Sequence, residues 1–295
     1  MSLILGVLLL FVTPIGNEML RNETNLRIGL LLIPFSTPLR INLLASFIIL
    51  LAIYVACFAI AFKSNDGLLS NFRNLMRGSH LPPIPNWLLV MPFVTSALLF
   101  LVISLTALQD SVGVPTGSLP DVDPFILLYS LAYSPLLEEW TFRISPIGFA
   151  VCLRILISTG RFQLAQSFLS PEVAKMKAGL PGIASAKWKG IHWSDWLALG
   201  ITSSIFGLAH LVAGGGWEVG KVTTATISGL ALGGVFLAYG AYASILLHWF
   251  FNYYFEAIVL ASNLIPSLDG IISLLTIALG IMSVGIVGKL VSERL

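Results

Sequence analysis

Long apolar runs separated by short polar segments dominate this chain. An α-helix rises 1.5 Å per residue, so about 20 mainly apolar residues span the hydrocarbon of a bilayer. Runs of this kind are found at residues 41–62, 87–107, 124–158, 195–215, 220–239, 241–263 and 269–288, and the N-terminus adds a run at 3–12 and a shorter one at 28–35. The pattern predicts an all-α, polytopic membrane protein with about eight transmembrane helices. We expect them to form one bundle around a polar cavity, as a single integral membrane domain over residues 1–295.

The charges between the runs predict the orientation. Segment 63–86 and segment 159–194 are basic, whereas segment 108–123 holds three aspartates and no lysine or arginine. Positively charged loops usually face the cytoplasm, so we expect both basic segments and the C-terminus on that side of the cell membrane. The run 124–158 must then cross once, as a long helix interrupted near Pro135 or Pro146. Loop 160–194, with tryptophans among its lysines, is interpreted as an interfacial cytoplasmic segment.

Composition agrees with this interpretation and excludes several classes of protein. Hydrophobic residues make up 57% of the chain and charged residues 10%, whereas soluble domains contain about 25% charged residues. The net charge of +2 comes without a dense basic block, so we expect no nucleic-acid partner. Both cysteines, Cys57 and Cys152, lie in apolar runs, which excludes a disulfide framework and a cysteine-based metal site.

Charged side chains inside a membrane are costly, so those within the apolar runs indicate function. The first cluster is Glu138-Glu139-Trp140-Thr141-Phe142-Arg143. On a helix Glu139 and Arg143 are four residues apart and share a face, which predicts a supporting ion pair. Glu138 points about 100° away and is then free to face a cavity. The alternative is a structural salt bridge beside a carboxylate without a role.

Two further clusters contain histidine. The first is Phe206-Gly207-Leu208-Ala209-His210, and the second is His248-Trp249-Phe250-Phe251-Asn252, in which His248 and Asn252 share a helical face. Each alone is explained by packing or by interhelical hydrogen bonds. A single converging site would explain all of these residues at once. One observation opposes convergence, since helix positions predict a roughly 12 Å axial offset between His210 and His248.

Such a site has the groups needed to hydrolyse an amide bond. Glu138 would accept a proton from water that His210 holds, and His248 with Asn252 would donate hydrogen bonds to the oxyanion. No cofactor is required by this mechanism, and the chain has no GxSxG motif for a nucleophilic serine. A second mechanism stays open, in which Glu138, His210 and His248 hold Zn²⁺ with one position left for water. The chain has no HExxH motif, the usual arrangement for that purpose.

The motifs EEWTFR, FGLAH and HWFFN, in that order, resemble those of the CAAX-protease and bacteriocin-processing (CPBP or ABI) family of intramembrane endopeptidases. The resemblance covers a core from about residue 124 to 255. It implies an eight-helix bundle with a conical cavity and glutamate-dependent peptide hydrolysis near the cytoplasmic side. It also implies that Glu138 activates water with His210, and that His248 and Asn252 form the oxyanion hole. Ile144 follows the arginine where family members often have glycine, and loop 160–194 resembles an insertion that could shape substrate entry.

The leading hypothesis is therefore an intramembrane endopeptidase. Its expected partners are the lipid bilayer and a membrane-anchored peptide or protein, which in the eukaryotic branch of the family carries a prenylated cysteine. Two other classes remain as alternatives. A proton- or metal-coupled transporter could use the same buried residues, although no internal repeat supports it. A catalytically silent membrane scaffold could keep them as a polar network, although it would need none of them in particular.

Overall fold

The computed structural model describes residues 20–30, 32–118, 124–212, 216–262 and 268–292, together with residues 12, 14 and 18. The described part of the chain is mostly helical, as the apolar runs predict. Apart from residue 12, the N-terminal run 3–12 lies outside the described residues.

Five helices among the described residues are long and apolar enough to cross a membrane. They are α3 (Leu43–Lys63), α5 (Trp87–Ser111), the stretch Tyr129–Thr159, α11 (Trp193–Val212) and α12 (Val219–Tyr239). Two further helices follow, α13 (Ala241–Ser262) and α14 (Leu268–Ser292), and a shorter apolar segment of α14 spans Gly270–Ile286. Each begins and ends within a few residues of a predicted run, but the predicted total of eight crossings is not confirmed.

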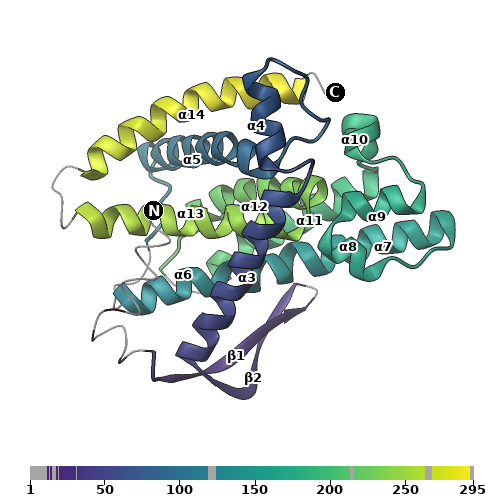
Figure 1. Cartoon of the computed structure of the whole chain (residues 1–295). Coiled ribbons are helices and arrows are strands. Elements are labelled where there is room, and N and C mark those ends of the chain that lie inside the picture. The colour runs from purple at the N-terminus through teal and green to yellow at the C-terminus, as the bar shows by residue number, and fades with distance from the viewer. Residues whose placement is uncertain are drawn as a thin grey trace.

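The long helices run side by side in one bundle (Figure 1). The main pairs are α11 with α12, α14 with α5, α13 with α6, and α12 with α13. α6 is Pro124–Glu139, and the short helix α4 is Leu68–Met76. The starts of α6 and α14 lie on the left in Figure 1, whereas α4 and the helices of segment 160–194 lie toward the other end. The bundle therefore has two distinct ends, which matters for the location of the site.

The run 124–158 continues past both prolines at which an interruption was predicted. Pro135 lies inside α6, and Pro146 occupies the first turn of α7 (Ser145–Thr159), where proline is tolerated. The irregularity lies between them, in a π-helical turn at Trp140–Ile144. Such turns are rare and often mark functional sites. Here the turn directly follows the two glutamates.

Residues 23–42 form a β-hairpin, so the fold is not purely helical and the apolar run 28–35 is not a membrane helix. β1 (Glu23–Leu30) pairs antiparallel with β2 (Ile33–Asn42), and Leu32 in the turn has φ 76°. The run is too short to span a bilayer as a helix, and polar residues flank it on both sides. The hairpin is tied to the bundle because Leu32 N–H donates to the Thr141 carbonyl of the π-helical turn (3.1 Å).

Segment 160–194 is a packed unit of short helices, not an extended loop. It contains α8 (Leu164–Leu169), α9 (Pro171–Ala178), α10 (Ile183–Ala186) and a 3₁₀ turn (Lys187–Gly190), and it packs on α7 and α12. Some of its charged side chains are buried inside this unit. Lys175 is fully buried, and its Nζ lies 3.5 Å from Oε2 of Glu172. Trp193 and Trp196 are exposed, as expected for a segment at an interface.

Candidate active site

The two adjacent glutamates have different environments. Glu139 is fully buried and its Oε1 lies 3.3 Å from Nη1 of Arg143, which is also fully buried. The predicted ion pair is thus present in the structure. The side chain of Glu138 is 26% exposed and lines a cavity. Successive residues of a helix point about 100° apart, so Glu139 can pair with Arg143 while Glu138 faces the cavity.

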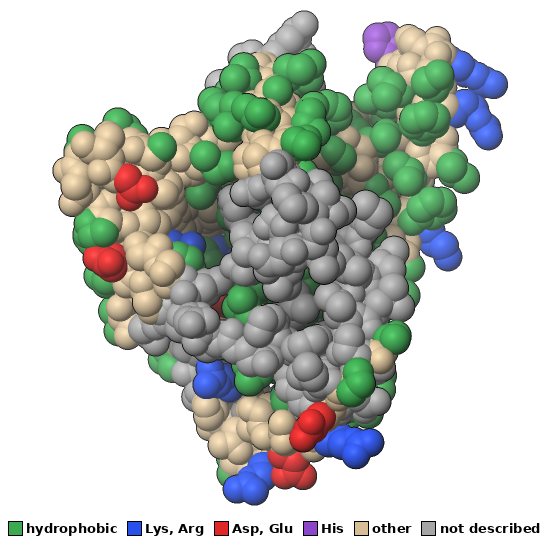
Figure 2. Space-filling model, turned by 90° about the vertical axis from the view of Figure 1, so that its left-hand side faces the viewer, with side chains coloured by type: hydrophobic (Ala, Val, Ile, Leu, Met, Phe, Trp, Pro, Cys, Tyr) green, Lys and Arg blue, Asp and Glu red, His purple; other side chains and the backbone are tan. Residues whose placement is uncertain are grey.

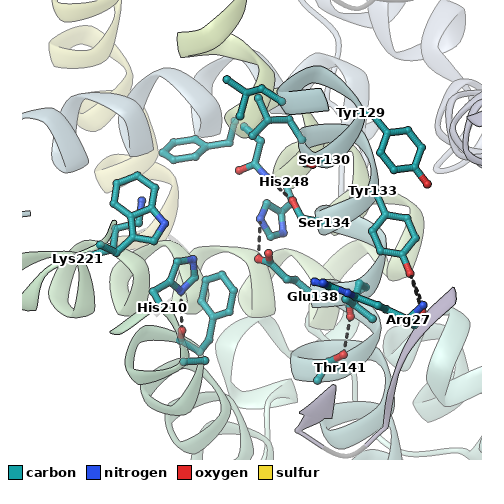
Figure 3. Close-up of a pocket in the computed structure, with 18 of the residues that line it drawn as sticks. Arg27, Tyr129, Ser130, Tyr133, Ser134, Glu138, Thr141, His210, Lys221 and His248 are labelled. Carbon is teal, nitrogen blue, oxygen red and sulfur yellow. Dashed lines mark hydrogen bonds and ion pairs between the residues drawn. The ribbon is translucent and has the colours of Figure 1, made fainter. Parts of the chain in front are cut away.

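His248 joins both carboxylates. Its Nδ1 lies 2.7 Å from Oε1 of Glu139, and its Nε2 lies 3.5 Å from Oε2 of Glu138 (Figure 3). The Arg143 guanidinium balances the charge of the buried Glu139 carboxylate. Such neutrality limits the cost of burying the group, because a buried charge without a counter-charge is strongly unfavourable.

His210 lies on the other side of the cavity from α6 (Figure 3). Its Nδ1 is 2.8 Å from the carbonyl oxygen of Phe206, to which it can donate only as N–H. In the neutral imidazole this leaves Nε2 as an acceptor. The Phe206 ring packs edge-on against His210 (4.7 Å between centroids) and against His248 (6.0 Å), and the Arg143 guanidinium lies 3.8 Å from its centroid. Phe206 therefore holds the two histidines and the ion pair in one arrangement.

A glycine brings α11, which carries His210, close to α12. A Cβ at Gly207 would lie 2.2 Å from Thr226 Oγ1 and 2.5 Å from the carbonyl oxygen of Val222. Glycine is thus needed for this helix contact, which fixes the position of Phe206 and His210 against the rest of the site.

Asn252 lies one turn beyond His248 on α13. Its Nδ2 donates to Oγ of Ser134, 3.2 Å away on α6. Ser134 in turn lies one turn before Glu138. Two antiparallel helices therefore present matched pairs, with Asn252 opposite Ser134 and His248 opposite Glu138. The amide of Asn252 retains a second N–H that can bond to another acceptor.

All four predicted residues, Glu138, His210, His248 and Asn252, line one cavity of about 1250 Å³. The two histidines share this cavity although they do not contact each other directly in the same helical layer. Phe206, one turn before His210, is the residue of α11 that packs against His248, and His210 extends the site from there. No described residue of segment 160–194 lines this cavity, so the structure gives no support to a role for that segment in substrate entry.

The described side chains also bear on whether the site could hold a metal ion. Within the described ranges, no group of three histidine, cysteine or acidic residues is close enough to hold one. Zinc ligands lie about 2.0–2.2 Å from the metal. Nδ1 of His248 is bonded to Glu139 and Nδ1 of His210 to a carbonyl, which leaves the Nε2 atom of each ring toward the cavity.

The cavity lies at one end of the bundle. Its lining includes Asp110 at the end of α5, His210 near the end of α11 and Lys221 at the start of α12. The basic segments 63–86 and 159–194 adjoin the opposite ends of these helices. Figure 2 views the molecule from the cavity end and shows charged side chains gathered over the hairpin at the bottom of the view. If the basic segments face the cytoplasm, the cavity lies toward the opposite side of the membrane. The family resemblance implies a cavity near the cytoplasm, so the two expectations cannot both be correct.

Several residues that line the site were not predicted from the sequence. Ser134 could have been found, because it lies four residues before Glu138 and so shares its helical face. Tyr133 and Arg27 could not, because their contact depends on the hairpin: the Tyr133 hydroxyl donates to the Arg27 carbonyl (2.6 Å) and accepts from its N–H (3.1 Å). Lys221 stood out only as a single charge at the edge of an apolar run.

Comparison with known protein families covers the same part of the chain. A family model described as type II CAAX prenyl endopeptidase, Rce1-like, matches residues 120–254. Over these residues, somewhat less than half of the chain, the sequence is similar to that family. The match confirms the resemblance indicated by the three motifs, and it includes α6, α7, α11, α12 and the part of α13 that holds His248 and Asn252. No curated protein and no solved structure gave a significant match. The Rce1-like core supports a peptidase of the CAAX-protease type in the membrane, and the hairpin, α3, α5 and α14 lie outside it.

Proposed function

We propose that this chain is an intramembrane endopeptidase that hydrolyses a peptide bond of a membrane-anchored peptide or protein with water activated by Glu138. The observation that carries the proposal is the contact between Glu138 and His248 at the cavity wall, backed by the buried Glu139–Arg143 pair. The Rce1-like core supports the same class of reaction.

In this mechanism a water molecule lies between Glu138 and His210. Oε of Glu138 accepts one proton of the water and Nε2 of His210 accepts a hydrogen bond from the other, because its Nδ1 donates to the Phe206 carbonyl. The water oxygen attacks the carbonyl carbon of the scissile bond. Glu138 then delivers the proton to the leaving nitrogen, so that water and peptide give a carboxylic acid and an amine.

The negative charge of the tetrahedral intermediate needs donors on the opposite side. Protonated His248 can donate from Nε2, and Asn252 from the N–H that Ser134 does not use. Glu139 and Arg143 act as positioning residues, since Glu139 holds Nδ1 of His248. The apolar surroundings strengthen each of these interactions relative to water.

Glu138→Gln tests the proposal, because glutamine keeps the shape of the side chain and cannot accept the proton. The probe is a quenched fluorescent peptide with an S-farnesyl cysteine followed by three residues, assayed in proteoliposomes with products identified by mass spectrometry. Loss of general base catalysis is expected to lower kcat by about 10²- to 10⁴-fold. Glu218→Gln is the matched control, because Glu218 is exposed and does not line the cavity. A Glu138→Gln enzyme with more than a tenth of wild-type turnover would contradict the proposal.

We also propose the orientation that the basic segments favour, with the C-terminus in the cytoplasm and the cavity opening on the opposite side. Cysteine labelling tests it, because Ser79 and Ser118 are exposed at opposite ends of the bundle and both native cysteines are buried. In intact cells a membrane-impermeant thiol reagent should modify Ser118→Cys and not Ser79→Cys. The reverse pattern would place the cavity on the cytoplasmic side, as the family resemblance implies.

A further inference from the structure

Lys221 is a cation in the cavity wall that forms no ion pair with any residue in the described part of the chain. Its Nζ lies 3.7 Å from the centroid of the Trp217 ring, and no acidic group of the described chain lies within ion-pair distance of it. Glu138 and Asp110 line the same cavity. Glu138 is close enough to interact electrostatically with Lys221 but does not pair with it.

Backbone hydrogen bonds join residues 115–118 to residues 216–220, and this connection, called the strap, fixes the position of Lys221. Glu218 N–H donates to the Thr116 carbonyl (3.1 Å) and Gly220 N–H to the Pro115 carbonyl (2.8 Å). The side-chain amide of Gln109 donates to the Gly220 carbonyl (3.1 Å). These bonds bind the start of α12 to the end of α5. Lys221 is therefore presented by a rigid wall.

Gly117 shows how closely the two loops of this strap approach. Its φ is 76°, and a Cβ would lie 2.2 Å from the carbonyl oxygen of Gly216. Both the backbone conformation and the space require glycine. Gly117 and Trp217 of the strap line the cavity together with Lys221.

A partly buried ammonium group that forms no ion pair with a described residue is costly, and binding an anion would relieve the cost. The ring of Trp217 keeps the ammonium in place without neutralising it. Figure 3 shows Lys221 and Arg27 on opposite sides of the Glu138–His248 pair. Of the two, Arg27 comes from the hairpin, and Lys221 lies beside the strap at the start of α12.

We propose that Lys221 binds the free α-carboxylate of the substrate and so selects peptide bonds a short distance from a carboxyl terminus. The inference rests on the proposed endopeptidase function and assigns a specificity-determining residue to the same cavity. A peptide lying across Glu138 with its last residue at the strap places its one obligatory anionic group beside the Nζ of Lys221. A charge-assisted hydrogen bond then forms between ammonium and carboxylate.

The experiment compares two forms of the farnesylated probe peptide, one with a free carboxylate and one with a terminal carboxamide. The ratio of kcat/KM for acid over amide is measured for wild type, Lys221→Met and Lys221→Arg. The matched control is Lys63→Met, because Lys63 is an exposed lysine at the end of α3, outside the cavity. Thermal unfolding in detergent is recorded for each protein, so that a folding defect is separated from a change in selectivity.

We expect wild type to prefer the acid by about tenfold or more, as for hydrogen bonds to charged groups. In Lys221→Met the ratio should fall to near one, whereas Lys221→Arg and Lys63→Met should keep most of it. A ratio in Lys221→Met equal to that of wild type would overturn the inference, as would a wild type without acid preference. Either result would leave the proposed hydrolysis intact. A wild type that cleaves neither peptide would overturn the proposed function itself.

A lipid phosphate is the other anion that could reach Lys221. The measurements are therefore repeated in phosphatidylcholine vesicles with and without phosphatidylglycerol. The inference predicts the same acid-over-amide ratios in both vesicles. If the effect of Lys221→Met instead depends on phosphatidylglycerol and not on the peptide terminus, Lys221 binds lipid headgroups and the inference is wrong.

Discussion

The imidazole of His248 lies 3.5 Å from the carboxylate of Glu138, which is the one of the two adjacent glutamates that lines the cavity. The same ring is held from behind by the buried carboxylate of Glu139, at 2.7 Å. One glutamate thus positions the histidine, and the other is free for chemistry. This division predicts that the two glutamates respond differently to the same substitution.

Glu139→Gln should destabilise the protein, whereas Glu138→Gln should not. Removing the Glu139 charge leaves Arg143 buried without its partner, and breaking a buried pair in this way typically costs about 3–5 kcal/mol. Glu138 is partly exposed and makes no contact with arginine, so its loss should change the free energy of unfolding little. Urea or thermal unfolding in detergent measures both variants. Equal destabilisation of the two would contradict the assigned roles.

Gly207→Ala should lower both stability and activity, because its methyl group would collide with Thr226 and the backbone of α12. The helices must separate or shift to accept it, and overpacking of this kind typically costs about 1–3 kcal/mol. His210 and Phe206 would move with α11. Gly200→Ala on the same helix is the control, since nothing lies within 4 Å of its added Cβ. Unfolding free energy and turnover are measured for both variants, and only Gly207→Ala should fall below wild type. A Gly207→Ala protein with wild-type stability and turnover would contradict the packing described.

Ser134→Ala should reduce kcat by about two- to tenfold with KM little changed. It removes the acceptor of the Asn252 amide and so loosens a donor assigned to the oxyanion, at a cost typical of one hydrogen bond. Ser130→Ala is the control, one turn earlier on α6 and also at the cavity. Steady-state kinetics on the farnesylated probe measures the effect. A change in KM alone would indicate a substrate-binding role for Ser134 instead.

Lys175 in α9 should make stability depend on alkaline pH. Burial lowers the pKa of its ammonium below the ordinary 10.5, and the nearby Glu172 offsets part of this effect. Between the lowered pKa and 10.5 the unfolded chain binds more protons than the folded one, so the free energy of unfolding rises with pH. As pH rises over that range, the unfolding free energy of wild type should increase relative to that of Lys175→Met. For Lys177→Met, an exposed neighbour, the difference from wild type should stay constant.

The sequence predicted most of the helices because their apolar runs are long and the charges between them are few. Spacing alone also predicted the Glu139–Arg143 pair, since four residues on a helix define a shared face. The hairpin was missed because the apolar run 28–35 has no polar residue that distinguishes a strand from a short membrane segment. The environment of Lys221 could not be predicted, because it depends on a strap between loops about 100 residues apart in the chain.

Water attack promoted by Glu138 is the central claim, and oxygen labelling tests it most directly. A single turnover of the probe peptide is run in H₂¹⁸O, and both the product and the enzyme peptide containing Glu138 are analysed by mass spectrometry. The account predicts one ¹⁸O in the new carboxylate of the product and none in Glu138. An unlabelled product carboxylate with ¹⁸O in the Glu138 side chain would show a covalent acyl-enzyme and contradict the account.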